Sequence, residues 1–199
     1  MLVSTALIDD FFAFVGAVCC LVVACVFLPD DGSTVLPYYI HLVLPIIAYK
    51  SVLYGGYYSF SMFYFIFGIV PLADYILGVD VANQTKTEQK LLHKEYKFKL
   101  FTLLIPVFVA GLVISGAWFL TCTEAGKSLT TLEFVGFSLS VGFYTGAIGI
   151  VVGHELCHKA KWFERLLGRF LMCIACYGHF YVEHTLGHHK DVATDNDPA

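Results

Sequence analysis

Charged side chains are scarce in this sequence. Only 14% of the 199 residues are Asp, Glu, Lys or Arg, whereas 58% are hydrophobic. A soluble domain of this length would need more charge than this to cover its surface. The mean hydropathy of +0.73 agrees, so the composition predicts a membrane protein.

Other features are also missing. The net charge of -4 is small, and there is no basic stripe or aromatic platform, so no nucleic-acid partner is expected. The seven cysteines suggest no disulfide framework. Cys173 and Cys176 form a CxxC in an apolar stretch, which indicates packing rather than a redox or zinc pair because no second CxxC accompanies it. We find no internal repeat.

Long apolar runs dominate the sequence instead. A helix that crosses a membrane needs about 20 mostly apolar residues, so we expect an all-α, multi-span integral membrane helical bundle. Residues 1–36 are interpreted as an N-terminal extension with an extra span of its own, and residues 166–177 as an interfacial or buried helix that is too short to cross. The candidate spans are 11–28, 37–55, 57–78, 100–120 and 132–153.

The basic residues predict how these spans are oriented. Ten of the twelve Lys and Arg residues fall in two segments, 80–99 and 154–199, which two predicted spans separate. Both segments therefore lie on the same side, and the positive-inside rule makes that side cytoplasmic. The segment 121–131 between those spans carries only Lys127, as an outer loop should.

Six of the eight histidines fall within residues 154–189. His154 and His158 follow the last predicted span, and a spacing of four residues places both on one helix face. His184 and His188 repeat this spacing, while His189 should be turned by about 100° on an α-helix.

Several neutral imidazoles crowded together form a strong site for a first-row transition metal such as iron, copper or zinc. Glu155 and Glu183 are expected either to bind the metal or to orient the ligand N–H groups.

A zinc metalloprotease is the main alternative from the motif alone. His154-Glu155-Leu156-Cys157-His158 fits HExxH, in which two histidines bind zinc and the glutamate acts as general base. A protease needs only one further ligand, so this interpretation does not explain why the second group contains three closely spaced histidines.

The two histidine groups resemble the histidine boxes of the alkane 1-monooxygenase family, within the membrane fatty acid desaturase and hydroxylase superfamily. The resemblance covers residues 37–199, interpreted as the N-terminal part of such a domain. The matching residues are Gly153-His154-Glu155-Leu156 and His158-Lys159, then Tyr177-Gly178-His179-Phe180, Glu183-His184, Gly187-His188-His189, Val192-Ala193-Thr194 and Asp197-Pro198-Ala199, and upstream Pro71-Leu72-Ala73-Asp74, Gly78, Asp80 and Asn83.

The resemblance implies a site for two non-haem iron ions held by nine histidines on the cytoplasmic face. We also predict that Glu155 takes part in catalysis and that His179 and Glu183 hold the ligands in place. Asp74 either supports the iron site in the same way or is a helix-end carboxylate at the membrane interface. Five of the nine ligands match positions in this sequence: His154, His158, His184, His188 and His189.

The implied reaction uses O₂ to hydroxylate the terminal C–H bond of an alkane or alkyl chain drawn from the lipid bilayer. Its electrons come from a rubredoxin-like donor and an NAD(P)H-dependent reductase. Four expected ligands lie beyond Ala199, so this chain is interpreted as an incomplete part of the enzyme. A fatty-acyl hydroxylase or desaturase of the same superfamily and a catalytically inactive membrane fragment remain alternatives.

Overall fold

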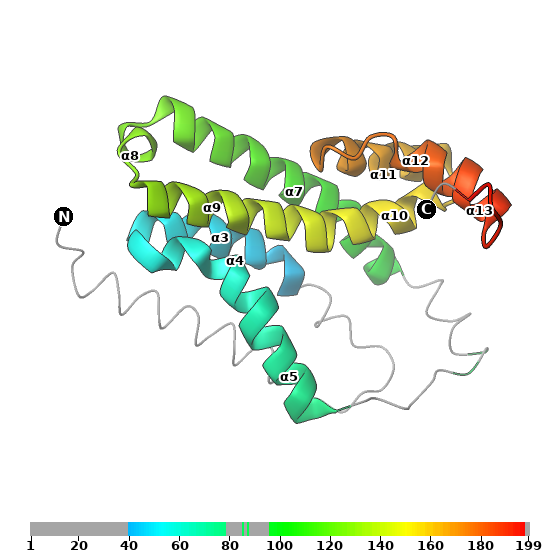
Figure 1. Cartoon of the computed structure of the whole chain (residues 1–199), viewed down its shortest axis with the longest axis horizontal. Helices are drawn as coiled ribbons and strands as arrows, with labels where there is room; N and C mark the ends of the chain where they lie inside the picture. Colours follow the sequence, from blue (N-terminus) through cyan, green and yellow to red (C-terminus); the bar gives the residue numbers. More distant parts are fainter. Residues whose placement is uncertain (1–39, 79–84, 86, 88–95, 198–199) are drawn as a thin grey trace.

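The computed structural model describes residues 40–78, 85, 87 and 96–197 (Figure 1). All the regular structure in these residues is helical, as the apolar runs predict. The predicted extra span at 11–28 lies outside the described residues. So do Asp80 and Asn83 of the upstream motif and Pro198 and Ala199 of the last one.

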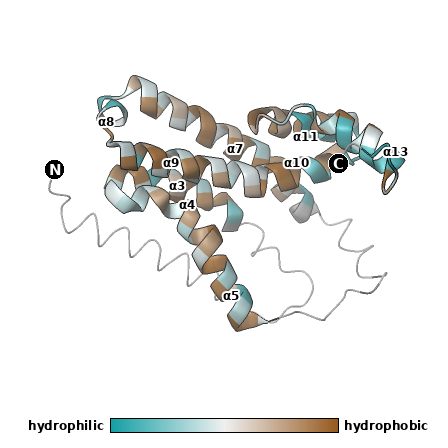
Figure 2. Ribbon diagram, viewed as in Figure 1, coloured by the Kyte–Doolittle hydropathy of each residue, from teal (hydrophilic) through white to brown (hydrophobic). Residues whose placement is uncertain are grey.

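Three continuous helices are long and apolar enough to cross a membrane: Gly56–Leu77, Lys99–Cys122 and Thr131–Cys157. They confirm the predicted spans at 57–78, 100–120 and 132–153, and they suggest an integral membrane protein. Figure 2 shows hydrophobic residues along these helices and hydrophilic residues gathered at α8 and α13. The first span consists of η2 (Gly56–Phe60), α4 (Ser61–Tyr64), η3 (Phe65–Ile69) and α5 (Val70–Leu77). The second span is α7 (Tyr96–Cys122), and the third consists of α9 (Thr131–Tyr144), η4 (Thr145–Ile150) and α10 (Val151–Cys157).

Of the predicted span at 37–55, residues 40–55 lie within the described part of the chain. Its described part consists of the short helix η1 (Ile40–Leu42) and the 11-residue helix α3 (Leu44–Tyr54). At 1.5 Å per residue α3 is about 16 Å long, about half of the hydrocarbon core of a bilayer. Pro45 lies in the first turn of α3, and Gly55, with φ of 77°, ends the helix. Gly55 is the predicted end of the span, while the start of α3 beside Pro45 was not predicted.

The core lies where α3, α4, α7, α9, α10 and the later helix α11 (Trp162–Ile174) meet, and it is built mostly from aliphatic side chains with one tyrosine. Small polar residues join α9 to the segment before α4. The Ser140 hydroxyl donates to the Ser59 carbonyl at 2.7 Å and accepts from the Met62 N–H at 3.3 Å. A methyl group at Gly136 would overlap Ser59 Oγ, so glycine is required for this close approach. The most deeply buried residues of this core are Leu44, Ala48, Met62, Ile105, Val109, Tyr144, Leu156 and Leu171.

One end of the bundle is closed by a network around Glu133, which we call the hairpin end. The Thr130 hydroxyl and the Glu133 side chain cap the start of α9 reciprocally. Glu133 Oε1 also accepts the N–H of Gly56 at 2.7 Å, which attaches the turn after α3 to the start of α9. α8 (Glu124–Lys127) connects α7 to α9 at this same end. Because His154 lies near the other end of the Thr131–Cys157 helix, the histidines occupy the opposite end of the bundle.

The helix α11 (Trp162–Ile174) crosses α10 at very close range. A methyl group at Gly168 would lie 2.7 Å from the Gly153 carbonyl oxygen and 2.8 Å from the Cys157 nitrogen. An ion pair of 2.7 Å between Lys99 Nζ and Glu164 Oε1 connects α11 to the start of α7. These contacts fix the direction in which the chain continues into α12 (Phe180–Val182), η5 (Glu183–His188) and α13 (His189–Asp191).

Candidate metal centre

The first histidine group lies where α10 ends. His154 is in its last turn and His158 is the C-cap residue. Their Nε2 atoms are 3.2 Å apart and their ring centroids 4.7 Å apart, so the prediction that they share one face is confirmed. The Gly153–Gly168 crossing buries the opposite side of this turn against α11, which leaves the imidazoles on the side that faces η5.

Of the second histidine group, His184 and His188 lie on η5, which is a π-helix and not the expected α-helix, and His189 begins α13. In a π-helix the hydrogen bonds run from residue i to residue i+5, and such segments are frequent at functional sites. The wider turn brings His189, five residues after His184, onto the same side, with their Nε2 atoms 3.1 Å apart. The α-helical geometry expected for His189 is therefore not observed, and its ring lies beside that of His184. His188 still stacks on His184, with ring centroids 5.4 Å apart.

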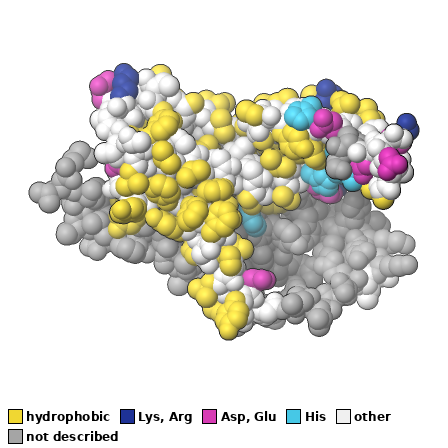
Figure 3. All heavy atoms as spheres, viewed as in Figure 1, with side chains coloured by type: hydrophobic (Ala, Val, Ile, Leu, Met, Phe, Trp, Pro, Cys, Tyr) yellow, Lys and Arg dark blue, Asp and Glu magenta, His cyan; other side chains and the backbone are white. Residues whose placement is uncertain are grey.

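The two groups meet although 30 residues separate them in the sequence. The Nε2 atoms of His154 and His184 are 2.8 Å apart. The rings of His158 and His189 also touch, with centroids 4.7 Å apart. The nitrogens offered by His154, His158 and His184 all lie within 4.8 Å of one another. Figure 3 shows histidine side chains gathered at this end of the molecule, beside charged groups.

These separations fit a shared metal ion. Two nitrogen ligands at right angles on a metal, with bonds of about 2.1 Å, lie about 3.0 Å apart. The observed Nε2 separations of 2.8, 3.1 and 3.2 Å are close to this value. An all-imidazole donor set suits iron, copper or zinc, so the described residues fit the predicted site for a transition metal.

The environment of the cluster also favours neutral, metal-binding imidazoles. Burial, and after it the charges of the neighbouring histidines, first among them His154 and His189, together lower the pKa of His184 to about 4. Burial and the same kind of neighbours lower the pKa of His158. A lowered pKa leaves the ring unprotonated at neutral pH, and a neutral ring has a free lone pair for a metal.

The residues after the second histidine group bring a carboxylate, that of Asp197, to His188. After α13 the chain turns back, with Ala193 at φ of 61° and the Asp197 N–H bonded to the Thr194 carbonyl at 3.1 Å. This turn places the Asp197 carboxylate 2.9 Å from Nδ1 of His188, and it also accepts the Ala193 N–H at 3.2 Å. A carboxylate on one ring nitrogen of histidine orients the other nitrogen for a metal.

Sequence reasoning included Asp197 in a motif but gave it no role. The signal that could have found it is a carboxylate nine residues after a predicted ligand, at the end of a polar turn. Phe180 was missed in the same way. Its ring stacks on His184 with centroids 4.6 Å apart and an interplanar angle of 16°, so it fixes the plane of that imidazole.

The structure does not bring the other predicted site residues into the cluster. Glu155 is exposed and pairs with Lys159 on the next turn. His179 and Glu183 pair with each other at 3.4 Å, and both are exposed. Asp74 is exposed on α5, which extends away from α10 and α12 in Figure 1. The catalytic or supporting roles assigned to these four residues remain predictions.

Comparison with known proteins agrees with the motifs. Residues 129–199 match the family model for fatty acid desaturase. The chain is 37% identical over 134 residues to alkane 1-monooxygenase 1 of Alcanivorax borkumensis. The matched region covers 67% of this chain and 32% of that protein. The corresponding values for alkane 1-monooxygenase 1 of Pseudomonas aeruginosa are 40% over 145 residues, 71% and 37%.

The alkane 1-monooxygenase of Pseudomonas putida is 37% identical over 134 residues, or 67% of this chain and 32% of the relative. The chain thus spans about a third of the length of the curated relatives that it matches. The resemblance inferred from the two histidine boxes is confirmed: over about two thirds of its length this chain is a homologue of the alkane 1-monooxygenases.

Proposed function

We propose that the protein is a membrane-bound, non-haem diiron monooxygenase that uses O₂ to hydroxylate the terminal C–H bond of an alkane or alkyl chain. The observation that carries this proposal is the convergence of two histidine groups at one end of an apolar helix. The names of the similar proteins support a monooxygenase that acts on alkanes. This chain would supply five of the histidine ligands, and the rest of the site would come from outside these 199 residues.

Each histidine has a structural reason to serve as a ligand. His154, His158, His184 and His189 already direct ring nitrogens toward one another. The fifth, His188, donates its Nδ1 proton to Asp197, which leaves Nε2 as the metal-binding nitrogen. Iron bound there would supply the oxygen activation and the C–H oxidation, while the protein fixes geometry and excludes competing reactions.

The surroundings of the cluster suggest how substrate and electrons reach it. An alkane dissolves in the hydrocarbon core of the bilayer, and α10 carries His154 directly out of a helix long enough to cross that core. We propose that the histidine end faces the cytoplasm, because Lys159, Lys161, Arg165 and Arg169 gather there. A cationic face of this kind suits an acidic soluble electron carrier, such as a rubredoxin with its NAD(P)H-dependent reductase.

An assay on the full-length protein tests this proposal. Membranes that contain the protein are supplied with rubredoxin, its reductase, NADH, n-dodecane and isotopically labelled O₂. We expect 1-dodecanol with one labelled oxygen atom, detected by mass spectrometry, and none from the His154→Ala variant. A product that is not oxygenated, or turnover that survives His154→Ala, would contradict the proposal.

A fatty-acyl hydroxylase or desaturase is the second candidate, because the matched family model is described as a fatty acid desaturase. The same membranes supplied with a saturated fatty-acyl substrate distinguish the two. A hydroxylated or unsaturated acyl product, formed without conversion of n-dodecane, would favour this second function.

A further inference from the structure

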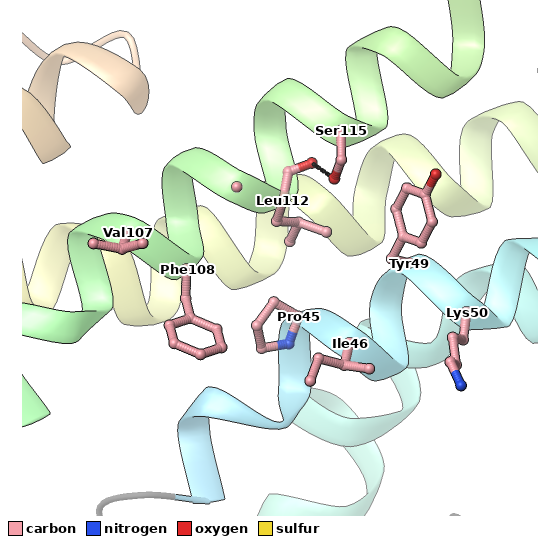
Figure 4. Close-up of a pocket in the computed structure, with 9 residues that line it drawn as sticks. Pro45, Ile46, Tyr49, Lys50, Val107, Phe108, Leu112 and Ser115 are labelled. Carbon is pink, nitrogen blue, oxygen red and sulfur yellow. Dashed lines mark hydrogen bonds between the residues drawn. The ribbon is translucent and has the colours of Figure 1, made fainter. Parts of the chain in front are cut away.

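A groove outside the histidine cluster separates α3 from α7. Its volume is about 370 Å³, within the range of small-molecule sites. Figure 4 shows Pro45 and Ile46 of α3 across from Val107 and Phe108 of α7. The complete lining is Pro45, Ile46, Tyr49, Lys50, Val107, Phe108, Gly111, Leu112 and Ser115.

The two walls of the groove run in the same direction. α3 ends at Gly55, which lies beside Glu133, and α7 ends at the short connection to the start of α9. Both helices therefore finish at the hairpin end. From Val107 to Ser115 the groove extends over about 12 Å at the helical rise of 1.5 Å per residue. Its polar residues, Tyr49, Lys50 and Ser115, lie toward the hairpin end, and its other end is apolar.

The groove opens sideways into the region that the apolar helices would occupy in a bilayer. Ile46 is 44% exposed and Val107 is 65% exposed, although both line it. Atoms that line an unfilled gap lose their dispersion contacts on one side. Water is absent from the hydrocarbon core, so the molecules able to fill such a groove are those dissolved in the membrane, which are predominantly lipid acyl chains.

Lys50 gives the site its polarity. The residue is exposed at the polar end of the groove, and no carboxylate among the described residues forms an ion pair with it. A lysine ammonium on its flexible stem reaches from the edge of the hydrocarbon core to the headgroups, where lysine binds phosphate as a point charge. The groove thus combines an apolar slot with a lysine toward its hairpin end, whose ammonium points away from α7 in Figure 4 and would reach a headgroup by rotation of its flexible stem.

We propose that this groove is a phospholipid site. One acyl chain lies between α3 and α7, and the phosphate of the same lipid pairs with Lys50 at the hairpin end, in the leaflet opposite the histidines. The site is separate from the proposed catalytic centre, so its test requires no activity measurement.

Gly111 offers a way to block the groove without disturbing the helices. It lines the groove, and a methyl group added there meets nothing within 4 Å. The side chain of Gly111→Leu would occupy the space of the acyl chain. Gly142 on α9 is equally open but does not line the groove, so Gly142→Leu is the matched control.

The experiment purifies the chain in a mild detergent from membranes that contain phosphatidylglycerol and phosphatidylcholine. Native mass spectrometry then counts the retained phospholipids, and a thermal melt verifies that each variant is folded. We expect about one phospholipid per parent chain, loss of most of it in Gly111→Leu, and no loss in Gly142→Leu. Lys50→Gln should retain a lipid but lose the preference for anionic phosphatidylglycerol.

If folded Gly111→Leu retains as much phospholipid as the parent chain, the groove is not the lipid site. Retention of free fatty acid in place of phospholipid would overturn the assignment of the ligand. An unchanged headgroup preference in Lys50→Gln would overturn the role of the ammonium.

Discussion

The two ends of the bundle use polar residues in opposite ways. At the hairpin end, Glu133 accepts hydrogen bonds from the Gly56 and Thr130 backbones and from the Thr130 hydroxyl, so acceptors meet donors. At the histidine end, groups of one chemical kind face each other, as with His154 and His184. Each neutral imidazole has only one donor and one acceptor. Hydrogen bonding within the protein explains the first arrangement, whereas the second suits a cation that several imidazoles share.

Of the substitutions that distinguish the two ends of the bundle, His184→Ala should have the largest effect. This ring contacts His154, His188 and His189, so its loss removes the centre of the cluster. Loss of a residue that only orients a ligand lowers metal affinity by about 10–100-fold. The loss in His184→Ala should be larger, and oxygenation should cease. Metal analysis of the purified full-length variant measures this. A variant that keeps its metal would show that the imidazoles are merely packed together.

Asp197→Asn should have the next largest effect. The substitution keeps the shape of the side chain but removes the charge that orients His188 through Nδ1. Loss of a group that hydrogen-bonds to a metal ligand typically lowers metal affinity by about 10–100-fold. We expect a loss in that range, measured by competition with a chelator. Asp195→Asn, an exposed position in the same turn, is the control and should bind metal normally. Equal affinities in the two variants would contradict the role of Asp197.

Gly168→Ala tests the crossing that supports the histidine end. Its methyl group would lie within 2.8 Å of two backbone atoms of α10, which cannot move aside as a side chain can. Overpacking of this kind costs about 1–3 kcal/mol, and we expect a lower melting temperature in detergent. Gly142→Ala meets no neighbour within 4 Å and should melt at or slightly above the parent temperature. If both variants melt alike, α10 and α11 are not closely packed.

Thr130→Ala should have the smallest effect, and only on stability. It removes the side-chain cap that accepts from the Glu133 N–H at 3.3 Å. Loss of such a cap typically costs about 1 kcal/mol, which unfolding in denaturant can measure, while the metal content should not change. A loss of metal in Thr130→Ala would show that the two ends are coupled and not independent.

Apolar length and histidine spacing predicted the parts of the molecule that depend on local sequence. Three spans follow from runs of about 20 apolar residues, and the shared face of His154 and His158 follows from helical geometry. The 37–55 span ends at Gly55 as predicted, whereas the start of α3 beside Pro45 was not predicted, because composition does not show where a helix begins.

Features that depend on how distant segments pack could not be predicted. The π-helical turn at η5 brings His189 beside His184, and no spacing rule for an α-helix anticipates it. The contact of Asp197 with His188 depends on the turn at Ala193. The close crossing of Gly153 and Gly168 depends on two helices that the sequence does not place in space.

Metal analysis combined with X-ray absorption spectroscopy tests the central claim most directly. The sample is the full-length protein, purified from iron-replete cells in a mild detergent. We expect about two iron ions per protein, as the family resemblance implies, with a first coordination shell of imidazole nitrogens that is lost in His184→Ala. Zinc in place of iron, no stoichiometric metal, or iron that persists in His184→Ala would contradict the account.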